Sequence, residues 1–275
     1  MNITENQLDK ILGCMIGGAV GDALGYPIEF CNIQSIRNMY GQQGLTRYLP
    51  NKDGVAEISD DTQMSLFTAN GLLYGFTQQA LPGKIRNYIA AAYCEWYETQ
   101  TGKKKPRKTC WIRDIPEMNH QRAPGITCMS SLRNIRKGKD VINNSKGCGG
   151  VMRVAPIALY PYPTENTREI ARLGAEATEI THHHPLGIYP AAMLVHLIYR
   201  MVNHPPDAIV LEDMIEEALV MHAEDYPLAA NCMKDLVHQA VHLAGEDMDD
   251  VAAIEKLGEG WTGDEAYAIA VYCSL

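Results

Sequence analysis

The sequence predicts an all-α fold, and three observations support that prediction. Hydrophobic residues recur at spacings of three and four along most of the chain, which is the period of an amphipathic helix. Alternation of apolar and polar residues, typical of half-buried strands, is nearly absent. The chain has 275 residues, 46% hydrophobic and 21% charged, a size and composition that allow a large globular core. We expect a single domain over residues 1–275, with about ten helices of roughly a dozen residues each.

The first helix is expected close to the N-terminus, because one set of apolar residues follows a single helix face: Leu8, Ile11, Leu12, Met15, Ile16, Ala19 and Ala23. The same segment carries a glycine at every fourth position: Gly13, Gly17, Gly21 and Gly25. A glycine inside a helix costs about 1 kcal/mol relative to alanine. We therefore expect a neighbouring helix to pack closely against this glycine ridge. The spacing differs from G-x-G-x-x-G and no strand precedes it, so a dinucleotide-binding fold is not predicted.

Six further helices are predicted from their periodicity, over residues 64–76, 85–98, 167–180, 189–202, 211–223 and 229–245. The stretch 102–125 is the clearest loop, since it is long and rich in proline and glycine. It contains a dense basic cluster, Lys103, Lys104, Lys105, Arg107 and Lys108. Such a cluster is usually a solvated surface, and the alternative is contact with the phosphates of a ligand.

Charge and cysteine usage narrow the class of protein. The formal net charge of −9 argues against a broad nucleic-acid groove, which needs a basic surface. None of the eight cysteines forms a C-x-x-C pair, which favours reduced thiols in a cytosolic protein. The N-terminal residues lack the features of a signal peptide, and the apolar run 11–21 is too short to span a bilayer. We expect a cytoplasmic protein that binds neither nucleic acid nor membrane.

Two adjacent aspartates, Asp60 and Asp61, follow Ser59 at the start of the helix predicted around 64–76. Serine and aspartate are favoured at helix N-termini, where they cap backbone N–H groups and suit the helix dipole. The alternative is a site for a hard cation, since a divalent ion binds such oxygens and relieves the repulsion between the carboxylates. Asp22 and Glu29, near the end of the first helix, are each typical of a cap or a surface when taken alone.

A glycine-rich segment, "NSKGCGGVMRVAPIAL" (144–159), precedes an apolar run. Gly147, Gly149 and Gly150 allow backbone N–H groups to close around an anion or a sugar, and a plain turn fits this segment equally well. Arg153, just beyond the glycines, is expected to pair with a phosphate or with an internal carboxylate.

Three consecutive histidines, His182, His183 and His184, precede a proline. Side chains of consecutive residues diverge, so the three are not expected to bind one zinc ion. Contact between one of them and a ligand is consistent with the pattern.

Taken in order, "GGAVGDALGYPIEF", "SDDTQMSL", "SKGCGGVMRVAPIAL" and "ITHHHP" resemble the ADP-ribosylglycohydrolase family, which includes the dinitrogenase reductase-activating glycohydrolases. The segment "GWTGDEAYAIAVYC" (260–273) is similar to another part of that family. The resemblance implies a compact, orthogonal multi-helix fold with a centre of two magnesium or two manganese ions. It also implies hydrolysis of the bond between C1″ of ADP-ribose and an acceptor, with ADP-ribose or an ADP-ribosylated protein as the partner.

The resemblance also assigns roles to residues. Ser59, Asp60 and Asp61 match metal ligands, and Glu29 and Asp61 are expected to be catalytic. The substrate-binding residues implied by the match are Ser145, Lys146, Gly147, Cys148, Gly149, Gly150, Val151 and His182.

Two departures from the family pattern qualify the expected activity. The family's closing G-D-x-D-[TS] motif does not occur in the chain, which we expect to be C-terminally incomplete relative to the family. Ala123 stands where the arginine-directed branch has an aspartate, and Cys148 stands where that branch has an asparagine. ADP-ribosyl-arginine is therefore not the default substrate. The alternative to an impaired hydrolase is a non-catalytic ADP-ribose binder or scaffold.

Overall fold

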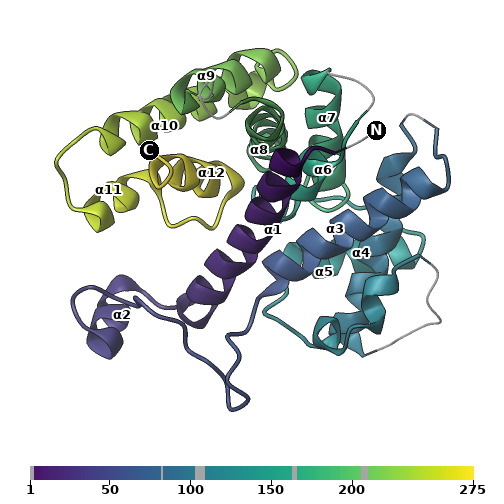
Figure 1. Ribbon diagram of the computed structural model, residues 1–275, viewed down its shortest axis with the longest axis horizontal. Helices are drawn as coiled ribbons and strands as arrows, with labels where there is room; N and C mark the ends of the chain where they lie inside the picture. The colour runs from purple at the N-terminus through teal and green to yellow at the C-terminus, as the bar shows by residue number, and fades with distance from the viewer. Residues whose placement is uncertain (1–2, 82, 103–108, 163–165, 206–209) are drawn as a thin grey trace.

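The computed structural model describes residues 3–81, 83–102, 109–162, 166–205 and 210–275, and this part of the chain is all-α, as predicted (Figure 1). Its α-helices are α1 (Glu5–Gly25), α2 (Ile33–Tyr40), α3 (Asp60–Thr77), α4 (Ile85–Thr101), α5 (Ile126–Arg136), α6 (Ala155–Leu159), α7 (Thr167–Thr178), α8 (Pro185–Asn203), α9 (Leu211–His222), α10 (Pro227–Ala244), α11 (Asp250–Leu257) and α12 (Gly263–Tyr272). Short 3₁₀ turns are η1 (Tyr26–Ile28), η2 (Trp111–Asp114), η3 (Pro116–Asn119) and η4 (Val151–Arg153).

The helices expected from periodicity appear as α1, α3, α4 and α7 to α10. The helices without an individual prediction include α2 and α11, of eight residues each, and α6, of five. Such short helices give few turns over which a period of 3.6 residues can be recognised. The basic cluster at 103–108 lies outside the described residues, so both interpretations of it, a solvated surface and contact with the phosphates of a ligand, stay predictions.

The core consists of two apolar clusters that meet at α8. One face of α8 contributes Ala191 and Val195 to a cluster formed mainly with α3, α4, α6 and α7. Its other face contributes Tyr189 and Met193 to a cluster formed with α9 to α12. Helix α8 therefore joins the two halves of the helical body, and α2 lies apart from that body at the lower left of Figure 1.

Close helix packing does occur at glycines, but at positions in α3 and α7. A Cβ added at Gly71 in α3 would lie 2.8 Å from the Cα of Ile89 and 2.9 Å from the carbonyl oxygen of Tyr88, both in α4. A Cβ added at Gly174 in α7 would lie 2.6 Å from Cγ2 of Val195 in α8. These two glycines let neighbouring helices approach closely.

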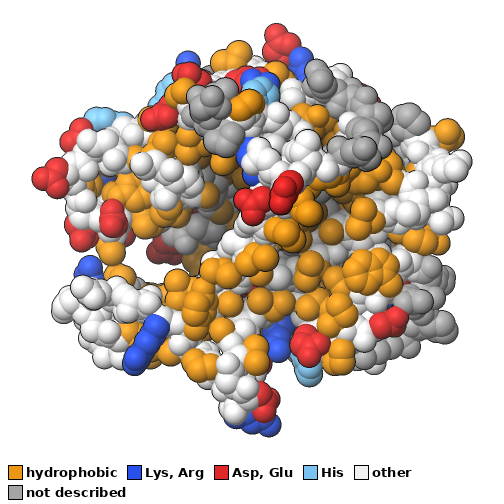
Figure 2. All heavy atoms as spheres, viewed as in Figure 1, with side chains coloured by type: hydrophobic (Ala, Val, Ile, Leu, Met, Phe, Trp, Pro, Cys, Tyr) orange, Lys and Arg blue, Asp and Glu red, His pale blue; other side chains and the backbone are white. Residues whose placement is uncertain are grey.

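The predicted packing of a helix against the glycine ridge of α1 is wrong. Nothing lies within 4 Å of a Cβ added at Gly13, Gly17, Gly21 or Gly25. Apolar side chains of α1 are also exposed, namely Leu8, Leu12, Ile16 and Val20, and hydrophobic side chains spread over the face that α1 crosses (Figure 2). The periodic pattern identifies the helix, but it does not reveal which face other parts of the structure cover.

Helices α1 and α8 are each long and apolar enough to cross a membrane by length and composition alone. For α1 this corrects the expectation drawn from the apolar run 11–21, because the helix extends beyond that run at both ends. Most of the apolar window of α8 is buried in the core, whereas only 6% of the corresponding window around α1 is buried. Burial explains the apolar composition of α8 as that of a core helix.

Candidate active site

A cavity of about 520 Å³ gathers residues from widely separated parts of the chain. It is bounded by the end of η1, the start of α3, the loop before α5, the glycine segment and the histidine segment. Seven of the residues predicted to form a site line this cavity: Glu29, Asp60, Asp61, Gly147, Cys148, Gly149 and His182. The tertiary structure thus brings carboxylates and a glycine-rich loop to one place.

The start of α3 explains how Ser59 and the two aspartates are arranged. Ser59 is the N-cap, and its Oγ accepts a hydrogen bond of 3.1 Å from the backbone N–H of Asp61. Asp60 and Asp61 occupy the first turn. Oδ2 of Asp60 accepts a 3.1 Å hydrogen bond from the N–H of Gly125. The capping interpretation holds for Ser59, while both aspartate carboxylates line the cavity.

Asp22 fixes this helix end from outside the helix. Its carboxylate accepts hydrogen bonds from the backbone N–H of Ser59, at 2.9 and 3.1 Å to its two oxygens, and from that of Thr62 at 3.2 Å. The hydroxyl of Thr62 donates to it as well. These N–H groups belong to the helix start, where intrahelical acceptors are lacking. Asp22 in α1 therefore serves as a tertiary cap for α3.

The carboxylates of the cavity repel one another. Burial of Asp60, which is 4% exposed, raises its pKa to about 7. The hydrogen bond from Gly125 opposes this rise, and the negative charges of Glu29 and Asp22 add to it. Desolvation raises the pKa of Asp61 as well, followed by the charges of Asp60, Asp22 and Glu29. Asp61 keeps substantial accessible surface, so water offsets part of that desolvation. Desolvation and the charge of Asp22 also raise the pKa of Glu29.

This concentration of negative charge suits a cation. Oxygen donors are the ligands that Mg²⁺ prefers, and a divalent ion would reverse the repulsion that raises the pKa values. Within the described ranges, however, no group of three or more His, Cys, Asp or Glu side chains is arranged to hold a metal ion. The chemistry of Asp60 and Asp61 fits a hard cation, and the described residues supply an incomplete set of ligands for it.

The glycine segment is held against the residues that precede α12. The N–H of Cys148 donates to the carbonyl of Trp261 at 3.0 Å, and the N–H of Gly263 donates to the carbonyl of Lys146 at 2.8 Å. A Cβ added at Gly149 would lie 3.0 Å from Cε1 of His182, so a larger residue there would press on the histidine ring. The fold therefore requires a bare backbone at this point.

The other residues of the predicted binding segment do not line the cavity. Oγ of Ser145 accepts a 3.3 Å hydrogen bond from the N–H of Gly147 and pairs with Thr127 at 3.0 Å. A Cβ added at Gly150 would lie 2.2 Å from Cγ2 of Thr178, and Val151 is buried in the core. These residues shape and anchor the loop, and their predicted contact with a substrate stays a prediction.

The three consecutive histidines separate, as expected from their diverging side chains. His182 is buried and lines the cavity. His183 is exposed, and its Nε2 lies 3.0 Å from the carbonyl oxygen of Glu179. Nδ1 of His184 accepts a 3.0 Å hydrogen bond from the N–H of Leu186 and so caps α8.

Arg153 follows neither of the two expectations stated for it. The residue is fully buried, and its Nη2 donates to Oγ1 of Thr181 at 2.7 Å and to the carbonyl of Ala177 at 3.1 Å. Its guanidinium lies 4.2 Å from the centre of the Tyr93 ring. No described carboxylate forms an ion pair with it. The apolar run that follows Arg153 carries this residue into the core, away from both proposed kinds of partner.

Two aromatic residues of the cavity were not predicted as site residues. Phe30 and Trp261 stack with their ring centres 5.8 Å apart, and they are 70% and 46% exposed. Phe30 directly follows Glu29 in the sequence, which was an available signal. The pairing with Trp261 links segments more than 200 residues apart, and sequence reasoning had no means to detect it.

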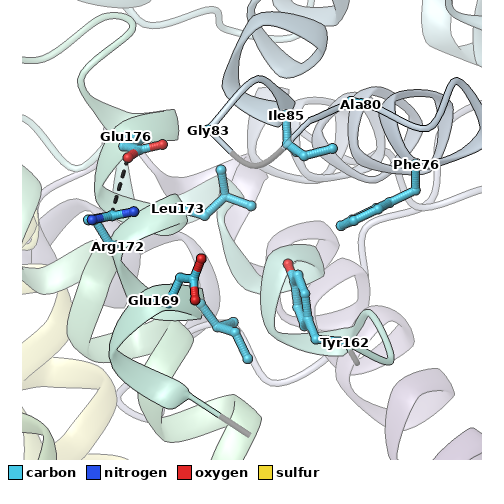
Figure 3. A pocket seen from close by; sticks show the side chains of 10 residues that line it. Phe76, Ala80, Gly83, Ile85, Tyr162, Glu169, Arg172, Leu173 and Glu176 are labelled. Atoms are coloured by element: carbon cyan, nitrogen blue, oxygen red, sulfur yellow. Dashed lines mark ion pairs between the residues drawn. The ribbon is translucent and has the colours of Figure 1, made fainter. Parts of the chain in front are cut away.

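A second, smaller cavity of about 200 Å³ lies between the end of α3, the start of α4 and α7 (Figure 3). Its walls are mostly apolar, with Phe76, Ile85 and Leu173 among them, and an ion pair of 3.4 Å joins Arg172 to Glu176 at its edge. No residue predicted to form a site lines it. The residues predicted to form a site therefore gather in the first cavity and not in this one.

The chain is similar to known proteins over most of its length. The family profile described as ADP-ribosylglycohydrolase matches residues 3–275. The chain is 27% identical over 267 residues to an uncharacterized protein of Archaeoglobus fulgidus, covering 96% of this chain and 76% of that protein. It is 30% identical over 203 residues to the ADP-ribosyl-[dinitrogen reductase] glycohydrolase of Rhodospirillum rubrum, covering 71% of this chain and 58% of that enzyme.

A further relative is the ADP-ribosylhydrolase ARH3 of Gallus gallus, 23% identical over 290 residues, with 97% of this chain and 73% of that protein covered. The aligned region thus spans less than two thirds of the Rhodospirillum enzyme and about three quarters of the other two. Since the family profile matches nearly the whole length, the chain belongs to the ADP-ribosylglycohydrolase family.

Proposed function

We propose that this protein hydrolyses the glycosidic bond between ADP-ribose and an acceptor group, with Mg²⁺ or Mn²⁺ bound at Asp60 and Asp61. The observation that carries the proposal is the shared cavity, in which an uncompensated carboxylate cluster faces a glycine loop and a histidine. Membership of the family supports the class of reaction. The names of two relatives, an ADP-ribosyl-[dinitrogen reductase] glycohydrolase and an ADP-ribosylhydrolase, point to the same bond.

Each part of the cavity has a proposed role that follows from its position and its chemistry. The loop around Gly147 and Gly149 allows a sugar or phosphate group to approach the backbone closely. Glu29 lines the cavity and has a raised pKa, which suits a carboxyl group that moves a proton between water and the leaving group. Asp60 and Asp61 supply oxygen ligands, while Ser59 and Asp22 hold the start of α3 in place. When bound, the metal ion would supply Lewis-acid and water-activating chemistry.

The experiment is to incubate the protein with Mg²⁺ and proteins ADP-ribosylated on arginine or on serine, and to measure released ADP-ribose. We expect release with at least one of these substrates. Asp60→Asn and Asp61→Asn should each lower turnover about 100-fold or more, the range of a lost catalytic group. Asp235→Asn, an exposed change in α10, is the matched control. Equal turnover in all variants would contradict the proposal.

A second candidate function is non-catalytic binding of ADP-ribose. It is favoured by the described residues' lack of a group of three or more metal-ligating His, Cys, Asp or Glu side chains. Titration calorimetry with ADP-ribose distinguishes the two candidates. Binding without release of ADP-ribose from any conjugate supports the binder, and binding with release supports the hydrolase.

A further inference from the structure

A buried positive charge lies in the core behind His182 of the candidate active site. Arg153 is fully buried, and its described polar contacts are neutral: Thr181, the carbonyl of Ala177, Sγ of Cys128 at 3.4 Å and Sδ of Met64 at 3.6 Å. An arginine cannot release its charge at ordinary pH, and burying a charge without a counter-ion is costly.

Thr181 connects this arginine to the histidine of the cavity. Its Oγ1 accepts the 2.7 Å hydrogen bond from Nη2 of Arg153, and it lies 2.9 Å from Nδ1 of His182. The hydroxyl has one proton, which can go to Nδ1, to the carbonyl of Thr178 at 3.4 Å, or to the sulfur of Cys128, which is a weak acceptor. That carbonyl already accepts two backbone N–H groups at 3.0 Å. Distance and available acceptor capacity both direct the hydroxyl proton to His182.

The charge of Arg153 favours the same arrangement. A cation that donates to a hydroxyl oxygen polarises the O–H bond and strengthens the donation that follows from it. The neutral imidazole then accepts at Nδ1 and carries its proton on Nε2. Burial, followed by the charges of Arg153 and His183, lowers the pKa of His182 to about 3, in line with a neutral ring at ordinary pH.

The outer nitrogen of this ring lies beneath the glycine loop. A Cβ added at Gly147 or Gly149 would lie 3.5 or 3.3 Å from Nε2 of His182, so the glycines leave this nitrogen uncovered by a side chain at the wall of the cavity. Among the described residues, Nε2 has no hydrogen-bond partner.

We propose that Arg153 and Thr181 are positioning residues that hold His182 as a neutral hydrogen-bond donor, with its proton on Nε2, for an oxygen of the bound nucleotide sugar. The inference rests on the proposed function for the identity of that ligand. A diphosphate is the group best served, because the buried guanidinium adds positive potential beneath the loop while the ring itself stays neutral. His182 is then neither the acid nor the base of the reaction.

The state of the ring can be measured without a substrate. Protein labelled with ¹⁵N-histidine should show His182 with a protonated Nε2 and an unprotonated, hydrogen-bond-accepting Nδ1, assigned by the loss of these signals in His182→Asn. Thr181→Val, of similar shape, should shift the ring to a mixture of tautomers, and Thr181→Ser should restore the original state. A wild-type ring protonated on Nδ1, or the same tautomer in all three proteins, would overturn the proposal.

Binding of ADP-ribose tests the use of this donor. By calorimetry, Thr181→Val should weaken ADP-ribose binding about tenfold, the worth of one hydrogen bond to a charged group, and Thr181→Ser should restore it. An unchanged affinity in Thr181→Val would refute the donor role. If wild-type protein shows the predicted tautomer but does not bind ADP-ribose, the proposed function fails while the relay from Arg153 to His182 stands.

Discussion

Asp60 and Asp61 are neighbours in the sequence but have different surroundings. Asp60 is buried and accepts a hydrogen bond from Gly125. Asp61 is exposed, and it borders both the candidate active site and a groove of about 640 Å³ between α1 and α3. Folding raises the pKa values of this pair because it buries the carboxylates and brings Asp22 and Glu29 close to them, whereas in an unfolded chain Asp22 and Glu29 lie far from the pair and water hydrates all four groups.

The pH dependence of stability should reveal this repulsion in protein kept free of metal by a chelator. The pKa of Asp60 rises from an ordinary value near 3.8 to about 7 on folding, so the folded state binds the proton more tightly. The stabilising contribution of Asp60 to the free energy of unfolding is therefore fully present below about pH 4 and is lost as the pH rises towards 7. Asp60→Asn removes the dependence.

Urea denaturation between pH 4 and 8 measures the effect. The free energy of unfolding of the wild type should fall relative to that of Asp60→Asn across this window and level off above it. Asp235→Asn should follow the wild type. If the free energies of unfolding of the wild type and of Asp60→Asn change with pH in the same way, folding does not raise the pKa of Asp60.

At the scale of the helix, both ends of α3 are set by contacts that its hydrophobic pattern does not show. At its start, the carboxylate of Asp22 accepts hydrogen bonds from the N–H groups of Ser59 and Thr62. At its end, Gln79 adopts a positive φ of 52°, and the N–H groups of Gln79 and Ala80 donate to the carbonyls of Phe76 and Gly75. This is a Schellman motif, in which glycine usually holds the left-handed position.

Asp22→Ala should destabilise the protein by about 1–3 kcal/mol, since it leaves helix-start N–H groups without their acceptor in a partly buried place. Chemical denaturation measures this loss. Asp9→Ala removes an exposed carboxylate from the same helix and should change stability by less than about 0.5 kcal/mol. Equal effects of the two changes would show that Asp22 does not act as a tertiary cap.

Gln79→Gly should stabilise the protein by about 0.5–1 kcal/mol, because glycine adopts positive φ without the steric cost of a side chain. Thermal unfolding of the wild type and the variant measures this gain in stability. Gln78→Gly serves as the control, since Gln78 has a φ of −84° and glycine gains nothing there. A gain in the control equal to that of Gln79→Gly would refute the conformational explanation.

At the scale of the whole molecule, glycines distinguish covered helix faces from open ones. Gly71 of α3 faces the backbone of α4, whereas Gly17 of α1 faces open space. Gly71→Ala should destabilise the protein by about 1–3 kcal/mol, because the two helices must separate to admit the methyl group. Gly17→Ala should stabilise it by up to about 1 kcal/mol through helix propensity.

Denaturation of the two glycine variants under one set of conditions is the decisive comparison. Opposite signs are expected. A destabilising Gly17→Ala would mean that the ridge of α1 is covered in solution, contrary to the open space around it.

Much of the architecture was predictable because helix periodicity is a local property of the chain. The segments that became α3, α4 and α7 to α10 carry the pattern over several turns. The start of α3 was also predictable, since Ser59 is a favoured N-cap. The order of the motifs indicated the family, which the full-length match then established.

Other features depend on contacts between distant segments. The sequence of α1 contains the glycine ridge, but the tertiary structure leaves that ridge open and closes α3 onto α4 instead. The stacking of Phe30 on Trp261 and the burial of Arg153 behind His182 also arise only on folding. The sequence by itself determined the helices and their chemical groups, because backbone hydrogen bonding and side-chain periodicity act over a few residues. Only the tertiary structure decided which groups share a cavity and which charges lose their water, because pKa shifts and packing depend on distances in space.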